Sequence, residues 1–96
     1  MNREEVLETL RAHRADLERF GVRSLSIFGS VARGEAGPES DVDVLADFGG
    51  PPSFDRYMDL KLYLEDLLGT RVDLATPGGL RARLRPIVDR EAIRVA

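Results

Sequence analysis

The sequence lacks cysteine altogether and contains a single histidine, His13. Without cysteine there can be no disulfide framework and no thiolate metal site, and one histidine cannot build an imidazole-rich zinc site. We therefore expect any bound metal ion to be held by oxygen ligands. His13 falls within a predicted helix and has no ligand-like pattern around it, so it is assigned no role.

Long apolar runs are also absent. No stretch approaches the roughly 18 apolar residues that would indicate a membrane span, and no basic start followed by an apolar segment indicates a signal peptide. We therefore expect a cytoplasmic protein that does not enter a membrane. The 96 residues, with 43% hydrophobic and 32% charged side chains, fit a single globular domain over residues 1–96. A substrate-selecting domain would then have to come from a partner.

Excess positive charge is missing too. The net charge of −3 argues against a coat protein held on nucleic acid by phosphate neutralisation. The distribution is uneven, because residues 79–96 carry five arginines against two acidic residues. Such arginines usually form a solvated helix face, and contact with nucleotide phosphates, nucleic acid or an acidic partner stays open. They are Arg81, Arg83, Arg85, Arg90 and Arg94.

The first half of the chain reads as helix, strand, turn and strand. Apolar residues at helical spacing predict an amphipathic helix over 4–20, ended by Gly21. Alternation predicts a strand over 24–28 and a second over 41–48. The glycine- and proline-containing stretch 34–40 between the strands predicts a chain reversal.

The second half reads as helix, strand and helix. Ser53 is a plausible N-cap for a leucine-rich helix that Gly69 ends, and a short strand is predicted over 71–76. A basic helical segment follows over 80–90, interrupted or restarted at Pro86. Two strands joined by a short turn imply a small mixed β-sheet flanked by helices, an α/β or α+β fold.

The informative motif is Gly29-Ser30 followed, after ten residues, by Asp41 and Asp43. Successive side chains of a strand point to opposite faces, so Asp41 and Asp43 share one face while Val42 points into the core. Close carboxylates repel each other unless a cation lies between them, and such hard oxygen ligands suit Mg²⁺. The pattern predicts a site for a metal ion and a nucleotide.

The segment before the carboxylates can bind phosphate. Gly29 allows the backbone to approach a ligand closely, and the Ser30 hydroxyl with nearby N–H groups can hydrogen-bond phosphate oxygens at the start of a short helix. Arg33 could add charge-assisted contacts. An Asp-x-Asp pair or a Gly-Ser turn alone is common on solvated surfaces, so the interpretation depends on their combination.

Phe28 to Glu35 together with Ser40 to Leu45 resembles the nucleotidyltransferase signature of the DNA-polymerase-β superfamily. The sequence is most similar to the minimal nucleotidyltransferases (MNT), including those paired with HEPN toxins. The resemblance covers nearly the whole chain, and it implies the polymerase-β-like nucleotidyltransferase fold.

The resemblance also implies roles for individual residues. Asp41 and Asp43 would hold metal ions, with Asp73 as the third carboxylate, around two Mg²⁺ ions. Asp73 matches by position, and alternation sets it on the face opposite Val72. Gly29 and Ser30 would bind the triphosphate of ATP, while Asp73 would help to deprotonate the attacking hydroxyl. Less suitable alternatives for the third carboxylate are Asp47, Asp55 and Asp59.

The function implied by the resemblance is Mg²⁺-dependent transfer of AMP from ATP to a hydroxyl, expected to be a tyrosine, of a partner HEPN toxin, with this chain as antitoxin. Two other functions stay open. One is an antitoxin that silences its partner by binding alone; the other is a nucleotidyltransferase acting on a small molecule or an RNA 3′ end. The identity of the NTP is not readable from the pattern. Tyr57 and Tyr63 are expected to pack in or beside the core.

Overall fold

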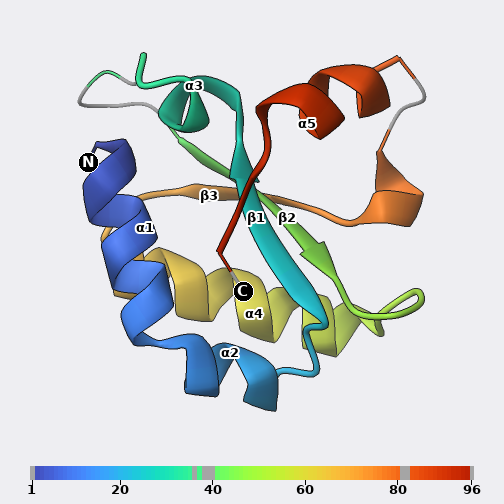
Figure 1. The fold of residues 1–96 in the computed structure, drawn as a ribbon. Helices are drawn as coiled ribbons and strands as arrows, with labels where there is room; N and C mark the ends of the chain where they lie inside the picture. Colours follow the sequence, from blue (N-terminus) through green and yellow to red (C-terminus); the bar gives the residue numbers. More distant parts are fainter. Residues whose placement is uncertain (1, 36, 38–40, 81–82, 96) are drawn as a thin grey trace.

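The computed structural model describes residues 2–35, 37, 41–80 and 83–95, and shows a sheet with helices around it (Figure 1). Ser40, Arg81 and part of the expected 34–40 reversal lie outside the described residues. None of the helices in the described ranges is long and apolar enough to cross a membrane. In chain order the elements are α1 (Arg3–Ala12), α2 (Arg14–Arg19), β1 (Ser24–Phe28), α3 (Gly29–Ala32), β2 (Val42–Asp47), α4 (Phe54–Leu68), β3 (Val72–Ala75), η1 (Pro77–Gly79), α5 (Arg85–Glu91) and β4 (Ile93–Arg94).

The sheet is mixed, with strand order β3-β2-β1-β4. β1 is antiparallel to both β2 and β4, whereas β2 and β3 are parallel. A parallel pair needs a crossover connection, and α4 provides it. The predicted mixed sheet flanked by helices is therefore confirmed, and the short strand β4 is an addition that the alternation pattern could not reveal.

One face of the sheet forms the hydrophobic core. β1 contributes Leu25 and Ile27, and β2 contributes Val42 and Val44, all at most 1% exposed. Because alternate residues share a face, the intervening positions of the same strands lie on the opposite face. The helices that cover the core face are α1, α2 and α4, which lie together on one side of the strands in Figure 1. They supply Val6, Leu10, Leu17, Leu60, Leu64 and Leu68.

The single helix predicted over 4–20 is wrong in one respect, because the segment divides into α1 and α2 at His13. This residue has φ −111° and ψ 23°, outside the helical range, and its Nδ1 lies 2.8 Å from the carbonyl oxygen of Thr9. The seven-residue separation of the buried Leu10 and Leu17 also fits an unbroken helix. The hydrophobic pattern therefore could not show the break.

The predicted ends of α4 are confirmed. The Ser53 side chain accepts a hydrogen bond from the backbone N–H of Arg56 at 3.2 Å, as an N-cap should. Gly69 ends the helix with φ 69°, in the left-handed region. The chain can then turn directly into β3.

The C-terminal basic segment contains a shorter helix than predicted, since α5 begins at Arg85 with Pro86 in its first turn. Pro86 has no N–H to donate, which suits the start of a helix and not its interior. After α5 the chain returns to the sheet as β4, and the N–H of Val95 donates to the Leu25 carbonyl oxygen at 2.7 Å. α5 lies near α3 at the end of β1 distant from α2 (Figure 1).

Candidate active site

Three side chains of the non-core face share one row across the sheet. The strand register pairs Phe28 with Asp43 and Asp43 with Asp73. Directly paired residues on neighbouring strands have adjacent side chains on the same face. The parallel pairing of β2 and β3 thus brings together two carboxylates that are far apart in the sequence.

The pKa of Asp43, the central residue of this row, is shifted strongly. Partial burial, followed by the negative charges of Asp73 and Asp41, raises its pKa from 3.8 to about 6, while the nearby Arg33 acts in the opposite direction. A hydrogen bond between Asp43 and Asp73 adds to the increase. Burial and like charge both disfavour the ionised form, and a bound cation would relieve both effects.

Asp41 lies just before β2, at the rim of the site. Its side chain is 51% exposed, and its Oδ1 is 3.9 Å from Nε of Arg71. Among the residues that the structure describes, no group of three His, Cys, Asp or Glu side chains is arranged to hold a metal ion. The structure therefore brings Asp43 and Asp73 together and leaves Asp41 turned toward Arg71.

The carboxylate pair nevertheless suits Mg²⁺. Asp43 and Asp73 offer hard oxygen ligands on one face, and Mg²⁺ commonly uses one or two protein carboxylates together with water and phosphate oxygens. An exposed ion pair at 3.9 Å contributes little stability. Asp41 could leave Arg71 at small cost and join the other two.

Gly29 begins α3 directly above Asp43. It has φ +72°, a conformation that L-amino acids rarely adopt, and a Cβ added here would overlap Oδ2 of Asp43. The backbone can pass this close to the carboxylate only because residue 29 has no side chain. Ser30, half-buried, follows at the start of α3, and the buried Val31 and Ala32 anchor this short helix in the core. The helix start is thus held beside the carboxylate pair.

The sequence profile of the nucleotidyltransferase domain family matches residues 7–95 of this chain. The chain belongs to this family. A protein adenylyltransferase, MntA, from Thermococcus cleftensis is 47% identical over 93 residues, which cover 96% of this chain and 94% of the relative. The family membership makes the chain a nucleotidyltransferase and confirms the family that the resemblance indicated.

Solved structures agree on the fold. A structure assigned as a minimal nucleotidyltransferase matches with a TM-score of 0.76 and 46% identity, covering 97% of this chain and 95% of the other. The MNT antitoxin in complex with a tri-AMPylated HEPN toxin from Shewanella oneidensis matches with a TM-score of 0.63 and 14% identity, covering 88% and 70%. At this low identity the second match supports the fold alone.

Arg33 of the nucleotidyltransferase follows α3 and forms two ion pairs. Its Nε lies 2.9 Å from Glu35, and its Nη1 lies 2.9 Å from Glu91 of α5. These carboxylates raise the pKa of Arg33, so the guanidinium stays charged. The sequence did not predict the contact of Glu91 with Arg33, because no local pattern links two residues so far apart in the chain.

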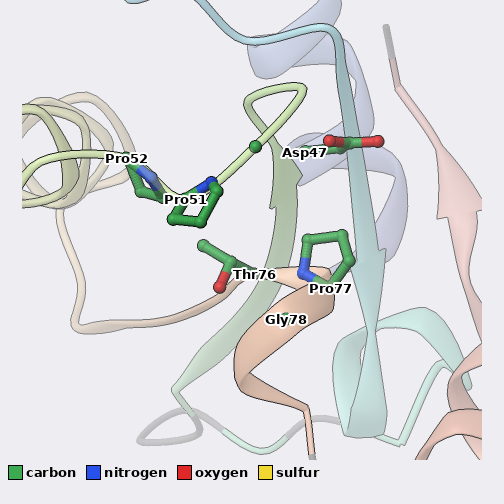
Figure 2. Close-up of a pocket in the computed structure, with 7 residues that line it drawn as sticks. Asp47, Pro51, Pro52, Thr76, Pro77 and Gly78 are labelled. Carbon is green, nitrogen blue, oxygen red and sulfur yellow. The ribbon is translucent and has the colours of Figure 1, made fainter.

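The alternatives to Asp73 as the third carboxylate, Asp47, Asp55 and Asp59, lie away from Asp43. Asp47 is at the far end of β2, where Oδ1 accepts from the Gly49 N–H at 2.8 Å, and it lines a different cavity with Pro51, Pro52, Thr76, Pro77 and Gly78 (Figure 2). Asp55 and Asp59 are exposed on α4, the helix that covers the opposite, core face of the sheet. Of the four candidates, only Asp73 pairs with Asp43.

Proposed function

We propose that this nucleotidyltransferase is a protein adenylyltransferase that transfers AMP from ATP to a tyrosine hydroxyl of a partner HEPN toxin, and thereby acts as its antitoxin. The observation that carries the proposal is the pairing of Asp43 with Asp73 beneath the Gly29 turn. The 47% identity to MntA of Thermococcus cleftensis supports a protein acceptor and AMP as the transferred group. A HEPN toxin as the partner is proposed by analogy with the complex of an AMPylated HEPN toxin and an MNT antitoxin, with which this chain shares only the fold. The proposal implies action in the cytoplasm.

The metal ligands in this proposal are Asp41, Asp43 and Asp73, which would hold Mg²⁺, expected as two ions. Bound Mg²⁺ would neutralise charge on the phosphates and orient them for displacement. Asp43, partly buried between the Gly29 turn and Asp73, is the central ligand. Asp41 completes the set after leaving Arg71.

Side chains and backbone groups around Asp43 and Asp73 would bind the triphosphate and accept the proton. The Gly29 turn and the N–H groups and hydroxyl at Ser30 bind the triphosphate. Arg33 contributes a charged donor and exchanges part of its contact with Glu35 or Glu91 for phosphate oxygen. Asp73 accepts the proton of the acceptor hydroxyl as it attacks. Most of the rate enhancement then comes from positioning and charge neutralisation.

The test is transfer of label from [α-³²P]ATP to the protein encoded by the adjacent reading frame, in the presence of Mg²⁺. We expect Asp43→Asn and Asp73→Asn each to lower the transfer rate by about 100-fold or more. Asp66→Asn is the matched control, because Asp66 is exposed on α4, and it should keep the wild-type rate. Absence of transfer by the wild type, or normal transfer by both site variants, would contradict the proposal.

The same variants separate catalysis from binding. If the Asp43→Asn/Asp73→Asn double variant still protects cells from the toxin fully, binding alone is the mechanism of neutralisation. If label instead appears on a small molecule or an RNA 3′ end, the reaction class stands and the acceptor is different. The proposal expects loss of protection together with loss of label on the toxin.

A further inference from the structure

A cavity of about 510 Å³ opens beside Asp73. Its volume is in the range typical of ligand sites. The lining comes from the end of β1, from α4, from β3 and from the segment after β3, and none of the described residues of α3 contributes. The lining residues are Phe28, Tyr57, Asp73, Leu74, Ala75, Thr76, Gly79, Leu80 and Leu84.

The chemistry of this cavity differs from that of a phosphate site. Asp73 is the one charged side chain among its described lining residues, and Phe28, Leu80 and Leu84 supply large apolar groups. None of the described lining residues carries a positive charge that could pair with a phosphate. A neutral side chain with an aromatic body and a hydroxyl tip is complementary to the same walls, with its hydroxyl toward Asp73.

The cavity also stands on the acceptor side of the site. The Gly29 turn lies against Asp43, whereas the cavity lies against Asp73 of the edge strand β3. In Figure 1, α3 and the segment after β3 are on opposite sides of β1. Displacement at phosphorus places the nucleophile and the leaving group roughly in line, on opposite sides. A triphosphate at the Gly29 turn therefore directs the acceptor to the cavity.

We infer that the cavity formed by Phe28, Leu80 and Leu84 beside Asp73 is the acceptor pocket and selects a tyrosine phenol over an aliphatic hydroxyl. This inference rests on the proposed function. In the step, the phenolic oxygen forms a bond to the α-phosphorus of ATP while the bond to the α,β-bridging oxygen breaks. Pyrophosphate leaves, and the phenolic proton passes to Asp73.

Leu84 provides the sharpest test, because it is 39% exposed at the cavity and its truncation should leave the fold intact. Leu84→Ala is expected to raise KM for the full-length toxin about tenfold, which corresponds to about 1.4 kcal/mol, because it removes one apolar wall of the pocket. KM for ATP should stay within about twofold. Leu62→Ala, which truncates a 57% exposed leucine on α4 outside the cavity, is the control and should change neither constant. Thermal melts of both variants verify folding.

A second arm varies the acceptor. When serine replaces the acceptor tyrosine of the toxin, wild-type transfer should fall strongly, and Leu84→Ala should cost little further. N-acetyl-tyrosinamide should inhibit competitively against the toxin and not against ATP. A rise in KM for ATP in Leu84→Ala would instead assign the cavity to the adenine base, and an unchanged preference for tyrosine over serine would also overturn the inference. Absence of any transfer by the wild type would count against the proposed function itself.

Discussion

At the scale of single residues, the charge of Asp43 opposes folding in the absence of metal. Burial, Asp73 and Asp41 raise its pKa from 3.8 to about 6, so the folded protein holds this proton more tightly than the unfolded chain. The stability gained from the bound proton is fully present below the unfolded pKa. It is lost as the pH rises from that value through the folded pKa of about 6.

Asp43→Asn should therefore stabilise the metal-free protein at neutral pH. We expect an increase of about 1 kcal/mol in the free energy of unfolding near pH 7.5, after allowance for solvent screening, and almost none near pH 4. Urea unfolding in EDTA at both pH values measures it. Added Mg²⁺ should stabilise the wild type and not the variant. An equal gain at both pH values would show that packing, and not charge, is responsible.

Gly29 is constrained by two separate factors, a positive φ and contact with Asp43. Gly29→Ala should cost about 2 kcal/mol or more, because the new Cβ overlaps Oδ2 of Asp43 in a left-handed backbone. Gly34→Ala is the matched control: its φ is +74° but nothing lies within 4 Å of the added Cβ, so only about 1 kcal/mol is expected. Thermal unfolding compares the two.

The double variant Gly29→Ala/Asp43→Ala separates the two factors at Gly29. Removing the Asp43 carboxylate should relieve the overlap and leave the cost of the backbone conformation. If Gly29→Ala and Gly34→Ala are equally destabilising, close approach to Asp43 is not what requires glycine at position 29.

At the scale of elements, β3 carries Asp73 and is tied at its first residue to α4. The N–H of Val72 donates to Oε2 of Glu65 at 3.0 Å, and Lys61 lies 3.2 Å from the same oxygen. These contacts lower the pKa of Glu65, with the Val72 hydrogen bond as the largest cause. Stability from Glu65 is therefore present above its unfolded pKa and lost as the pH falls through the lower, folded pKa.

Glu65→Ala should lower Tm by several degrees, because it leaves the N–H at the start of an edge strand without its acceptor. Lys61→Ala removes only a surface ion pair and should have a much smaller effect. Scanning calorimetry at neutral pH, and again at a pH low enough to protonate Glu65, measures both. Equal effects of the two substitutions would show that the ion pair, and not the strand contact, is the useful interaction.

At the scale of the whole molecule, the C-terminal residues close the sheet against the N-terminal helices. β4 pairs with β1, and the buried Val95 is 3% exposed. Arg11 and Arg14 of α1 and α2 reach the carbonyl oxygens of Arg94 and Val95, each at 3.5 Å. The last strand thus joins segments from both ends of the described chain.

Val95→Asp should destabilise the whole fold, because it places a carboxylate among the apolar side chains of the core. We expect a loss of about 3 kcal/mol or more in urea unfolding, against about 1–2 kcal/mol for Val95→Ala, which removes only apolar contact. If the two variants unfold at the same urea concentration, residue 95 is not part of the cooperative core.

The sequence by itself determined the local features. Alternation set Asp43 on the face opposite Val42, side-chain chemistry set Ser53 and Gly69 at the ends of α4, and the Gly-Ser and Asp-x-Asp spacing indicated the family. These features depend on residues close to one another in the chain, so local sequence patterns can predict them.

Only the tertiary structure decided which distant groups meet. The register that pairs Asp43 with Asp73, the return of β4 to β1, the ion pair of Arg33 with Glu91 and the cavity at Leu84 all join segments separated by a helix or more. Such contacts follow from how whole elements pack and from the register of long-range strand pairing. The register depends on both strands and on the helix that connects them, and a one-residue shift would change every partner at once.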